Sequence, residues 1–200
     1  MRSALPVHGL GAVLAGGRST RFGADKARVP LAGASLLERA VATLCAVFDD
    51  VVVLSSDPAH VLDGVERVPD LRDGFGPLAA IEAALGVAHR RGFDGVFILA
   101  CDLPLVEPEQ IRTLLDGLGQ TQAVAPAREG PPGFEPLCAF YRTSCLAPAG
   151  ALLDSGRRGA HALLERVQGH TIPMPSGRFL NVNTTAELVA AEASLRSPRT

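Results

Sequence analysis

Two glycines and two cations lie close together near the start of the chain, in the stretch VLAGGRSTRFGADKARVP (residues 13–30). Gly16 and Gly17 end an apolar run, and Arg21 and Lys26 follow shortly after it. Glycines let backbone N–H groups approach phosphate oxygens closely, and cationic side chains neutralise the charge that a phosphate carries. This combination of residues predicts a site for a phosphate-rich ligand.

The stretch matches neither of two common phosphate-binding patterns. A P-loop contains Gly-Lys-Ser/Thr, whereas Lys26 follows Asp25. The dinucleotide pattern G-x-G-x-x-G also fails, because Gly9 and Gly11 stand at the start of the expected strand rather than after it, and Leu14 occupies the position of the third glycine. The ligand must therefore be inferred from polar residues elsewhere in the chain.

Two carboxylates stand where strands are expected to end. Asp102 closes the most apolar predicted strand, VFILACD, and Asp70 follows a shorter one. A carboxylate is the hard oxygen ligand that Mg²⁺ prefers, and phosphates complete the coordination shell. The glycine loop, the cations and Asp102 together predict a site for a nucleoside triphosphate and its metal ion.

The elements that would position these residues alternate between strand and helix. Strands are expected at 10–17, 51–56, 66–70 and 96–102, and helices at 35–48, 76–91 and 108–119. Ser35 with Glu38 forms a capping box at one helix start, and Pro77 opens another helix. The alternation predicts an α/β fold, with an open, mostly parallel twisted sheet and helices on both faces. The glycine loop, Asp70 and Asp102 should meet outside the carboxyl ends of the strands.

The second half of the chain is less regular. Extended stretches are expected at 123–129 and 136–142 on either side of a Gly/Pro-rich loop, followed by short helices at 149–154 and 160–168. Thr184 and Glu187 are expected to cap a final helix. Too little chain follows the Gly/Pro-rich loop to form a second core, so residues 1–200 are predicted to be a single domain.

Composition excludes several classes of partner. The net charge is −2 and the cations are scattered, so neither nucleic acid nor an anionic membrane is expected as a ligand. No signal peptide is recognised, and the apolar runs are too short to span a membrane. Four cysteines without CxxC spacing predict buried thiols in a reducing, cytoplasmic location. The five histidines are scattered and are interpreted as surface or packing residues.

The segment LAGGRSTRFGADKA (14–27) closely resembles the signature of the molybdenum cofactor guanylyltransferases, the MobA family of nucleotidyltransferases. Later motifs of that family resemble DGFGPLAAI (73–81), CDLPLV (101–106), EPLCAFYR (135–142), SGRRG (155–159) and NVNTTAEL (181–188), so the similarity covers nearly the whole chain. The double glycine distinguishes this family from relatives that carry LAAG. Those relatives include the cytidylyltransferase counterpart and sugar-phosphate nucleotidyltransferases.

The resemblance implies a Rossmann-like nucleotidyltransferase fold and a reaction of GTP with molybdopterin that yields molybdopterin guanine dinucleotide and pyrophosphate, with Mg²⁺. It implies nucleotide contacts at Leu14, Ala15, Gly16, Gly17, Lys26, Leu54, Asp70 and Asp102. Asp102 would also bind Mg²⁺, while Asn181 and Asn183 would lie near the metal or the pterin phosphate. A molybdopterin-loading protein and molybdoenzymes are the partners that the family suggests.

The chain departs from the family pattern at three places. Leu54 is followed by Ser55 and Ser56 where the family often has Asn, so a contact there must use the backbone or a serine hydroxyl. Ala80 replaces the last glycine of the GPLxG pattern and would narrow the room beside the nucleoside. Thr185 replaces a proline at a helix start, a change expected to be harmless.

The expected mechanism is in-line attack of the terminal phosphate of molybdopterin on the α-phosphorus of GTP. The nucleophile is already an anion, so no strong general base is required, and no serine, histidine or cysteine is recognised as a covalent nucleophile. Catalysis would consist of positioning and electrostatic stabilisation. Arg21, Lys26 and Asp102 are the predicted catalytic residues, the two cations neutralising the departing pyrophosphate.

Other functions remain open on the sequence. A related nucleotidyltransferase could use CTP or a sugar-phosphate acceptor, and a non-catalytic module could bind a nucleoside triphosphate without turnover. Lys26, Asp102 and Arg21 together argue against a pure binding module, which needs neither a metal ligand nor a leaving-group cation. A nucleotide-sugar glycosyltransferase is disfavoured, because residues 100–104 read ACDLP and contain no D-x-D motif.

Overall fold

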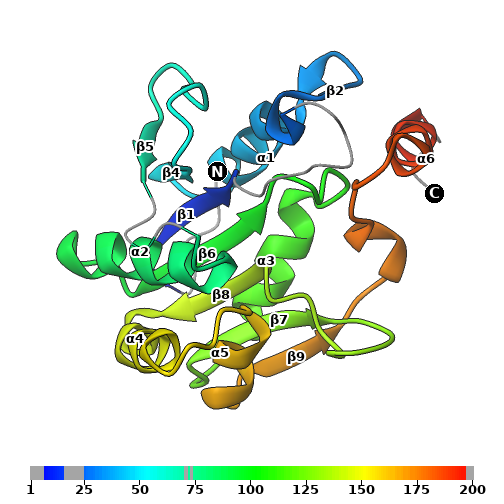
Figure 1. Ribbon diagram of the computed structural model, residues 1–200. Helices are drawn as coiled ribbons and strands as arrows, with labels where there is room; N and C mark the ends of the chain where they lie inside the picture. The colour runs from blue at the N-terminus through cyan, green and yellow to red at the C-terminus, as the bar shows by residue number, and fades with distance from the viewer. Residues whose placement is uncertain (1–6, 16–24, 70–71, 73, 197–200) are drawn as a thin grey trace.

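A seven-stranded sheet forms the centre of the computed structural model, which describes residues 7–15, 25–69, 72 and 74–196 (Figure 1). The strand order is β5-β4-β1-β6-β8-β7-β9. The strands are β1 (Gly9–Leu14), β4 (Val51–Leu54), β5 (Glu66–Val68), β6 (Gly95–Ala100), β7 (Ala123–Ala127), β8 (Cys138–Arg142) and β9 (His170–Pro173). Only β8 runs antiparallel to its neighbours, β6 and β7. The predicted open, mostly parallel sheet is confirmed.

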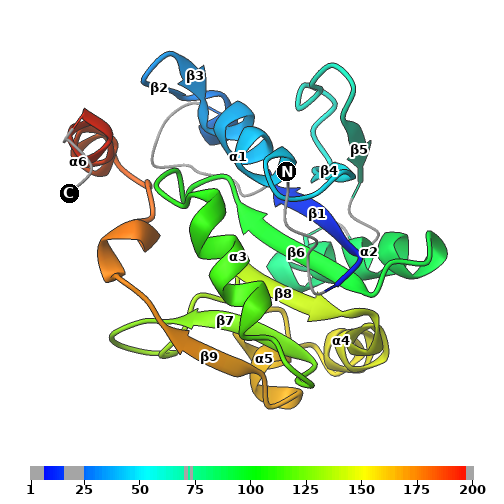
Figure 2. The same cartoon turned by 180° about the vertical axis from the view of Figure 1, so that it is seen from behind.

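Helices cover both faces of the sheet (Figures 1 and 2). One face packs against α1 (Leu36–Cys45) and α3 (Pro108–Asp116), and the other against α2 (Pro77–Arg90), α4 (Leu146–Asp154) and α5 (His161–Arg166). Successive side chains of a strand point to opposite faces. In β6, Val96 and Ile98 therefore join one core cluster, while Phe97 and Leu99 join the other. Burial on both faces explains why the strands read as continuous apolar runs.

A third, smaller apolar cluster joins segments that are far apart in the sequence. It packs α6 (Thr185–Arg196) against the hairpin of β2 (Pro30–Leu31) and β3 (Ala34–Ser35), and its buried members are Leu31, Leu36, Leu105, Val182 and Ala191. This cluster brings the end of the chain next to the segments that follow Lys26 and Asp102.

Most predicted helix starts are confirmed to within one residue, but α4 begins at Leu146 rather than at residue 149, and some predicted ends are wrong. Ser35 caps α1 with Glu38 in a complete capping box, and Pro77 stands in the first turn of α2. The first helix ends at Cys45 rather than at Phe48, because the N–H groups of Val47 and Phe48 both turn back to the carbonyl oxygen of Leu44. The hairpin β2–β3 and strand β9 were not predicted, since such short segments carry no periodic signal.

The cysteine prediction is confirmed at three positions and wrong at one. Cys101, Cys138 and Cys145 are buried and none of the four cysteines forms a disulfide, but Cys45 is exposed. It lies one residue beyond Leu44, whose side chain faces the core from the last turn of α1. Within the described part of the chain, none of the helices has the length and apolar character needed to cross a membrane.

Candidate active site

The direction in which strands are added to the sheet reverses at β1. Strands β4 and β5 extend the sheet on one side of β1, and β6 lies on its other side. The carboxyl ends of β1 and β6 therefore meet, with Leu14 paired to Ala100 and the Cys101 N–H donating to the Leu14 carbonyl at 3.1 Å. In open α/β sheets such a reversal is where ligands bind.

Three of the predicted site residues come together beside this reversal. The Lys26 ammonium donates hydrogen bonds to Asp102 Oδ2 at 2.7 Å and to Asn183 Oδ1 at 2.6 Å. The Lys26 side chain is 12% exposed and that of Asp102 is 27% exposed, so a ligand can still reach the carboxylate. The ammonium only donates, which orients the amide oxygen of Asn183 towards Lys26. We call these three residues the phosphate-side cluster.

Each member of the cluster is held by local structure. Lys26 begins the short 3₁₀ helix η1 (Lys26–Arg28), which Asp25 caps by accepting from the Ala27 N–H at 3.1 Å. Asp102 lies in the turn after β6, and its carbonyl oxygen accepts from the Val182 N–H at 2.9 Å.

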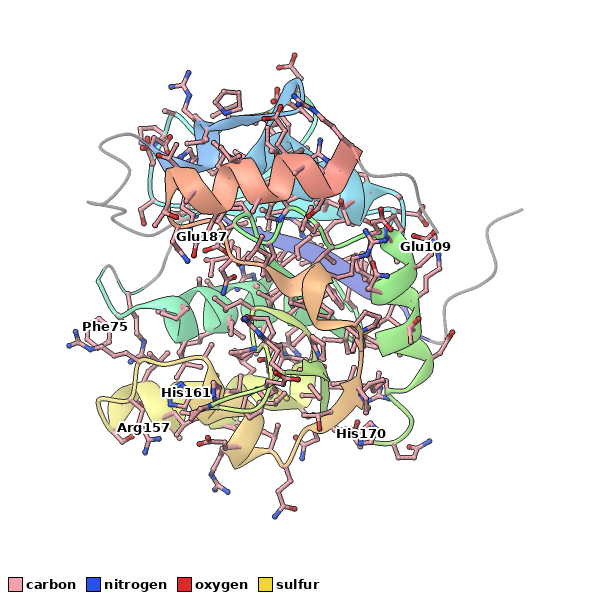
Figure 3. The ribbon with its side chains drawn as sticks, turned by 90° about the vertical axis from the view of Figure 1, so that its right-hand side faces the viewer. Phe75, Glu109, Arg157, His161, His170 and Glu187 are labelled. Atoms are coloured by element: carbon pink, nitrogen blue, oxygen red, sulfur yellow. The ribbon has the colours of Figure 1, made fainter. Side chains whose placement is uncertain are left out.

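Asn183 is held by the cap of α6. Its N–H donates to Glu187 Oε2 at 2.7 Å, and the hydroxyl of Thr184 donates to the same oxygen at 3.0 Å. These two hydrogen bonds, that of Asn183 first, lower the pKa of Glu187. The predicted pairing of Thr184 with Glu187 is confirmed, and Glu187 lies at the first turn of α6 in Figure 3.

The apolar residues predicted to contact the nucleotide have buried side chains. Leu14 is 7% exposed, Ala15 1% and Leu54 0%. Any contact at these positions must therefore use backbone atoms, and the Leu54 carbonyl already accepts from the Ala15 N–H at 3.1 Å. Ala80 is 1% exposed and packs within the core cluster under α2, where its methyl group adds apolar contact. Gly16, Gly17, Arg21 and Asp70 lie outside the described residues.

Asn181 lines a cavity of about 390 Å³. Its walls come from the start of α2 at Pro77, from the Gly/Pro-rich loop between β7 and β8, and from the turn that leads into α5 at His161. The loop contributes Glu135, which is 7% exposed and forms an ion pair with Arg128. We call this space the acceptor-side cavity. Figure 3 shows His161 on the same, left-hand side of the view as Glu187 and below it.

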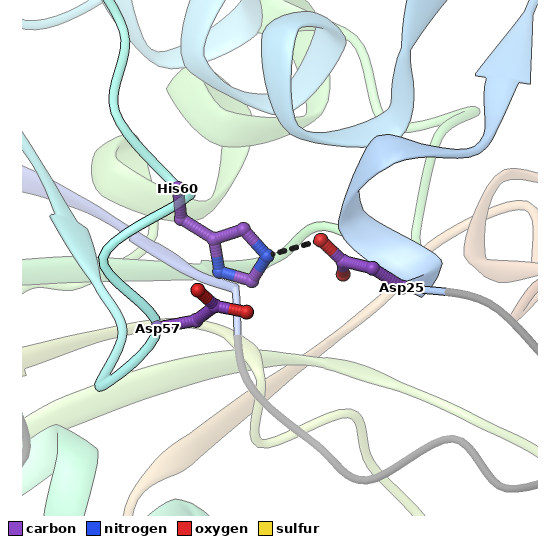
Figure 4. A group of neighbouring side chains, drawn as sticks. All are labelled: Asp25, Asp57 and His60. Atoms are coloured by element: carbon purple, nitrogen blue, oxygen red, sulfur yellow. Dashed lines mark hydrogen bonds and ion pairs between the residues drawn. The ribbon is translucent and has the colours of Figure 1, made fainter.

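A second polar group includes Asp25, the residue before Lys26, and the sequence did not predict it. Asp25, Asp57 and His60 each offer a ligand atom within 4.8 Å of the others, a grouping that could hold a metal ion (Figure 4). However, His60 Nε2 bonds to Asp25 Oδ2 and Nδ1 bonds to the Ser55 hydroxyl, both at 2.7 Å. Both ring nitrogens are thus occupied, so hydrogen bonds alone explain the group. The oxygen donors of Asp102 and Asn183 fit a hard cation better.

The buried nucleophiles near the site are not accessible to a substrate. Ser55, His60 and Asp25 are connected like a catalytic triad, but Ser55 is only 2% exposed. Burial, strengthened by the nearby charge of Asp102, raises the pKa of the Cys101 thiol to about 12. Neither group therefore provides a covalent nucleophile, in agreement with the sequence interpretation.

The fold and the cluster at the sheet reversal define the class of protein as a nucleotidyltransferase. The family model for the MobA-like NTP transferase domain matches residues 11–171, and the chain belongs to this family. The resemblance seen in the sequence is thereby confirmed.

Individual relatives agree with this assignment. The "Molybdenum cofactor guanylyltransferase" of Desulfosudis oleivorans is 34% identical over 200 aligned residues, which cover 94% of this chain and 96% of that protein. The crystal structure of molybdopterin-guanine dinucleotide biosynthesis protein A from Archaeoglobus fulgidus is 27% identical with a TM-score of 0.73, covering 93% of this chain and 98% of its own. The 2-C-methyl-D-erythritol 4-phosphate cytidylyltransferase of Thermus thermophilus has a TM-score of 0.71 at 17% identity and the same coverage, and shares the fold.

Proposed function

We propose that the protein transfers GMP from GTP to molybdopterin and releases pyrophosphate. The observation that carries the proposal is the Lys26 ammonium bonded to both Asp102 and Asn183 beside the strand reversal. A metal ligand and a phosphate-binding cation are needed at one place for nucleotidyl transfer. Family membership and the relatives named for guanylyl transfer to the molybdenum cofactor support the choice of substrates.

Lys26 neutralises phosphate charge in this proposal. An ammonium has three N–H donors, of which Asp102 and Asn183 occupy two, so one remains for a phosphate oxygen. Arg21 adds the second cation. Both act most strongly as the bond to pyrophosphate breaks, when negative charge builds up on the leaving group.

Asp102 is the residue proposed to hold Mg²⁺, and its ion pair with Lys26 uses Oδ2. Mg²⁺ would supply charge neutralisation at the nucleotide oxygens when bound. The carboxylate and the neighbouring Asn183 amide oxygen are hard donors of the kind that this cation prefers. Backbone groups of Leu14, Ala15 and the two following glycines, with Leu54 and Asp70, complete the proposed nucleotide site.

The acceptor-side cavity is proposed to receive molybdopterin. Its volume of about 390 Å³ falls within the range of small-molecule sites. Asn181 lines it and is two residues from Asn183. Between them, the Val182 N–H donates a hydrogen bond to the Asp102 carbonyl oxygen. A pterin in the cavity would therefore place its terminal phosphate beside the phosphate-side cluster. A molybdopterin-loading protein would deliver this substrate in the cytoplasm, and molybdoenzymes would receive the product.

The test is release of pyrophosphate from GTP, CTP, ATP and UTP, each with Mg²⁺ and with or without molybdopterin. We expect release only with GTP and molybdopterin together. A preference for CTP would keep the fold and mechanism but overturn the choice of nucleotide. Binding of GTP without release under any condition would identify a binding module instead.

A further inference from the structure

A buried chain of hydrogen bonds joins the sheet to the residue before Lys26. Ser55 directly follows β4 and bonds through its hydroxyl to His60 Nδ1 at 2.7 Å. His60 Nε2 then bonds to Asp25 Oδ2 at 2.7 Å, as Figure 4 shows. Ser55 is 2% exposed and His60 5%, so this chain is shielded from water for most of its length.

Every polar atom of this chain has a partner that suits it. A carboxylate only accepts, so Nε2 donates to Asp25 and Nδ1 is left to accept from the Ser55 hydroxyl. The Ser55 oxygen in turn accepts from the Asp57 N–H at 3.1 Å. Removing the ring would leave the buried Ser55 hydroxyl without its partner, which is costly in a site sheltered from water, and would release the Asp25 carboxylate, which is 33% exposed, to solvent.

The Asp25 carboxylate is held from two sides. Oδ2 accepts from His60, and Oδ1 accepts from the Ala27 N–H at 3.1 Å and so caps η1. Ser55 is anchored to the sheet because its own N–H donates to the Val68 carbonyl at 3.0 Å. These hydrogen bonds link the orientation of η1 to strand β4 and to its neighbour, the edge strand β5.

This anchoring matters because η1 has only three residues. A 3₁₀ segment of that length has no stability of its own. Ala27 is 3% exposed and fixes the middle of η1 in the core, while Asp25, the residue before the helix, caps it by accepting from the Ala27 N–H. The backbone of Lys26 lies between these two anchors. Asp102 and Asn183 hold only the far end of its side chain.

We infer that His60 is a positioning residue, which acts through Asp25 to direct Lys26 into the site. The inference rests on the proposed function for its catalytic readout. A misplacement of about 1 Å in a reacting group can cost on the order of 10²-fold in rate. His60 therefore contributes to turnover although it is buried and reaches Lys26 only through Asp25.

The test compares His60→Leu, which removes both hydrogen bonds, with His60→Gln, which keeps a donor and an acceptor. The matched control is His89→Leu, on the exposed face of α2. We expect His60→Leu to lower kcat for pyrophosphate release about 10- to 100-fold, with His60→Gln recovering most of the loss. The control should retain the kcat of the unaltered protein. Equal kcat values in all three variants would overturn the inference.

A double-mutant cycle separates positioning from simple stabilisation. If His60 acts through Lys26, His60→Leu should lower kcat much less when Lys26→Ala is already present. If His60→Leu lowered kcat by the same factor with and without Lys26→Ala, its role would be generally structural and the inference would be overturned. Should His60→Leu fail to fold, Ser55→Ala replaces it in the same cycle, since it removes only the hydroxyl that orients the ring.

Amide hydrogen exchange provides a readout that does not depend on the reaction. His60→Leu or Ser55→Ala should speed exchange at the Ala27 and Arg28 N–H groups, which His89→Leu should not. Unchanged exchange there would overturn the inference even if the enzyme is active. If the unaltered protein releases no pyrophosphate, the proposed function fails, while this exchange measurement still decides whether His60 orders η1.

Discussion

The two sides of the site are built in different ways. On the phosphate side, Lys26, Asp102 and Asn183 bond directly to one another, although 76 and 157 residues of sequence separate Lys26 from its two partners. On the acceptor side, loops enclose a cavity of about 390 Å³ whose walls are partly backbone, glycine and proline. A triphosphate needs fixed charges, whereas a bulky heterocycle needs space and a few polar contacts. Substitutions should therefore affect rate on one side and acceptor binding on the other.

The largest effect is expected from Asp102→Asn. Loss of the carboxylate removes the proposed metal ligand and the counter-charge of Lys26 together. We expect Mg²⁺-dependent pyrophosphate release to fall by at least on the order of 10³-fold while the fold is retained. Kinetics across a Mg²⁺ titration, with circular dichroism as the folding control, measure this. An unchanged dependence on Mg²⁺ would contradict the assignment of Asp102.

Lys26→Ala should have the next largest effect. The variant keeps the metal ligand but loses the cation that neutralises the leaving group, so we expect kcat to fall on the order of 10²–10³-fold. Steady-state kinetics with saturating GTP and molybdopterin measure the loss. Turnover close to that of the unaltered protein would remove Lys26 from the catalytic residues.

Asn181→Ala is expected to act on the acceptor side alone. One hydrogen bond is worth roughly 1 kcal/mol, so the KM for molybdopterin should rise about 3- to 10-fold. The KM for GTP should stay the same, because Asn181 lines the acceptor-side cavity. Asn183→Ala is the matched control and should instead lower kcat, since it removes a partner of Lys26. Identical kinetic changes in both variants would abolish the distinction between the two sides.

The smallest effect concerns acid pH and the cap that holds Asn183. Hydrogen bonds from Asn183 and Thr184 lower the folded-state pKa of Glu187 below its unfolded value of about 4.3. Its contribution to stability is therefore complete above that unfolded pKa and is lost as the pH falls through the folded pKa. The free energy of unfolding, measured with urea between pH 3 and 6, should fall more steeply towards acid pH in the unaltered protein than in Glu187→Gln. The same pH dependence in both proteins would contradict the role of this cap.

Local signals in the sequence predicted much of the fold and part of the site. The capping box at Ser35 and Pro77 at the start of α2 concern neighbouring residues, and the structure confirms both. The apolar strand before Asp102 is also confirmed, although it ends at Ala100 and Asp102 lies in the turn that follows. The Ser55–His60–Asp25 chain could not be predicted in this way. His60 lies 35 residues from Asp25, and an isolated histidine carries no signal of its partners.

The sequence alone predicted the fold class, the family and the residues of the phosphate-side cluster. It could do so because strand and helix patterns and the family motifs are local features. Only the tertiary structure decided which of these residues touch. Reversal of strand order at β1 and the small apolar cluster under α6 bring Lys26, Asp102 and Asn183 within hydrogen-bond distance. It also decided that Leu54 and Ala80 face the core, and that His60 is hydrogen-bonded to Asp25, the residue before Lys26. Such contacts depend on packing between segments far apart in the sequence, which no local pattern encodes.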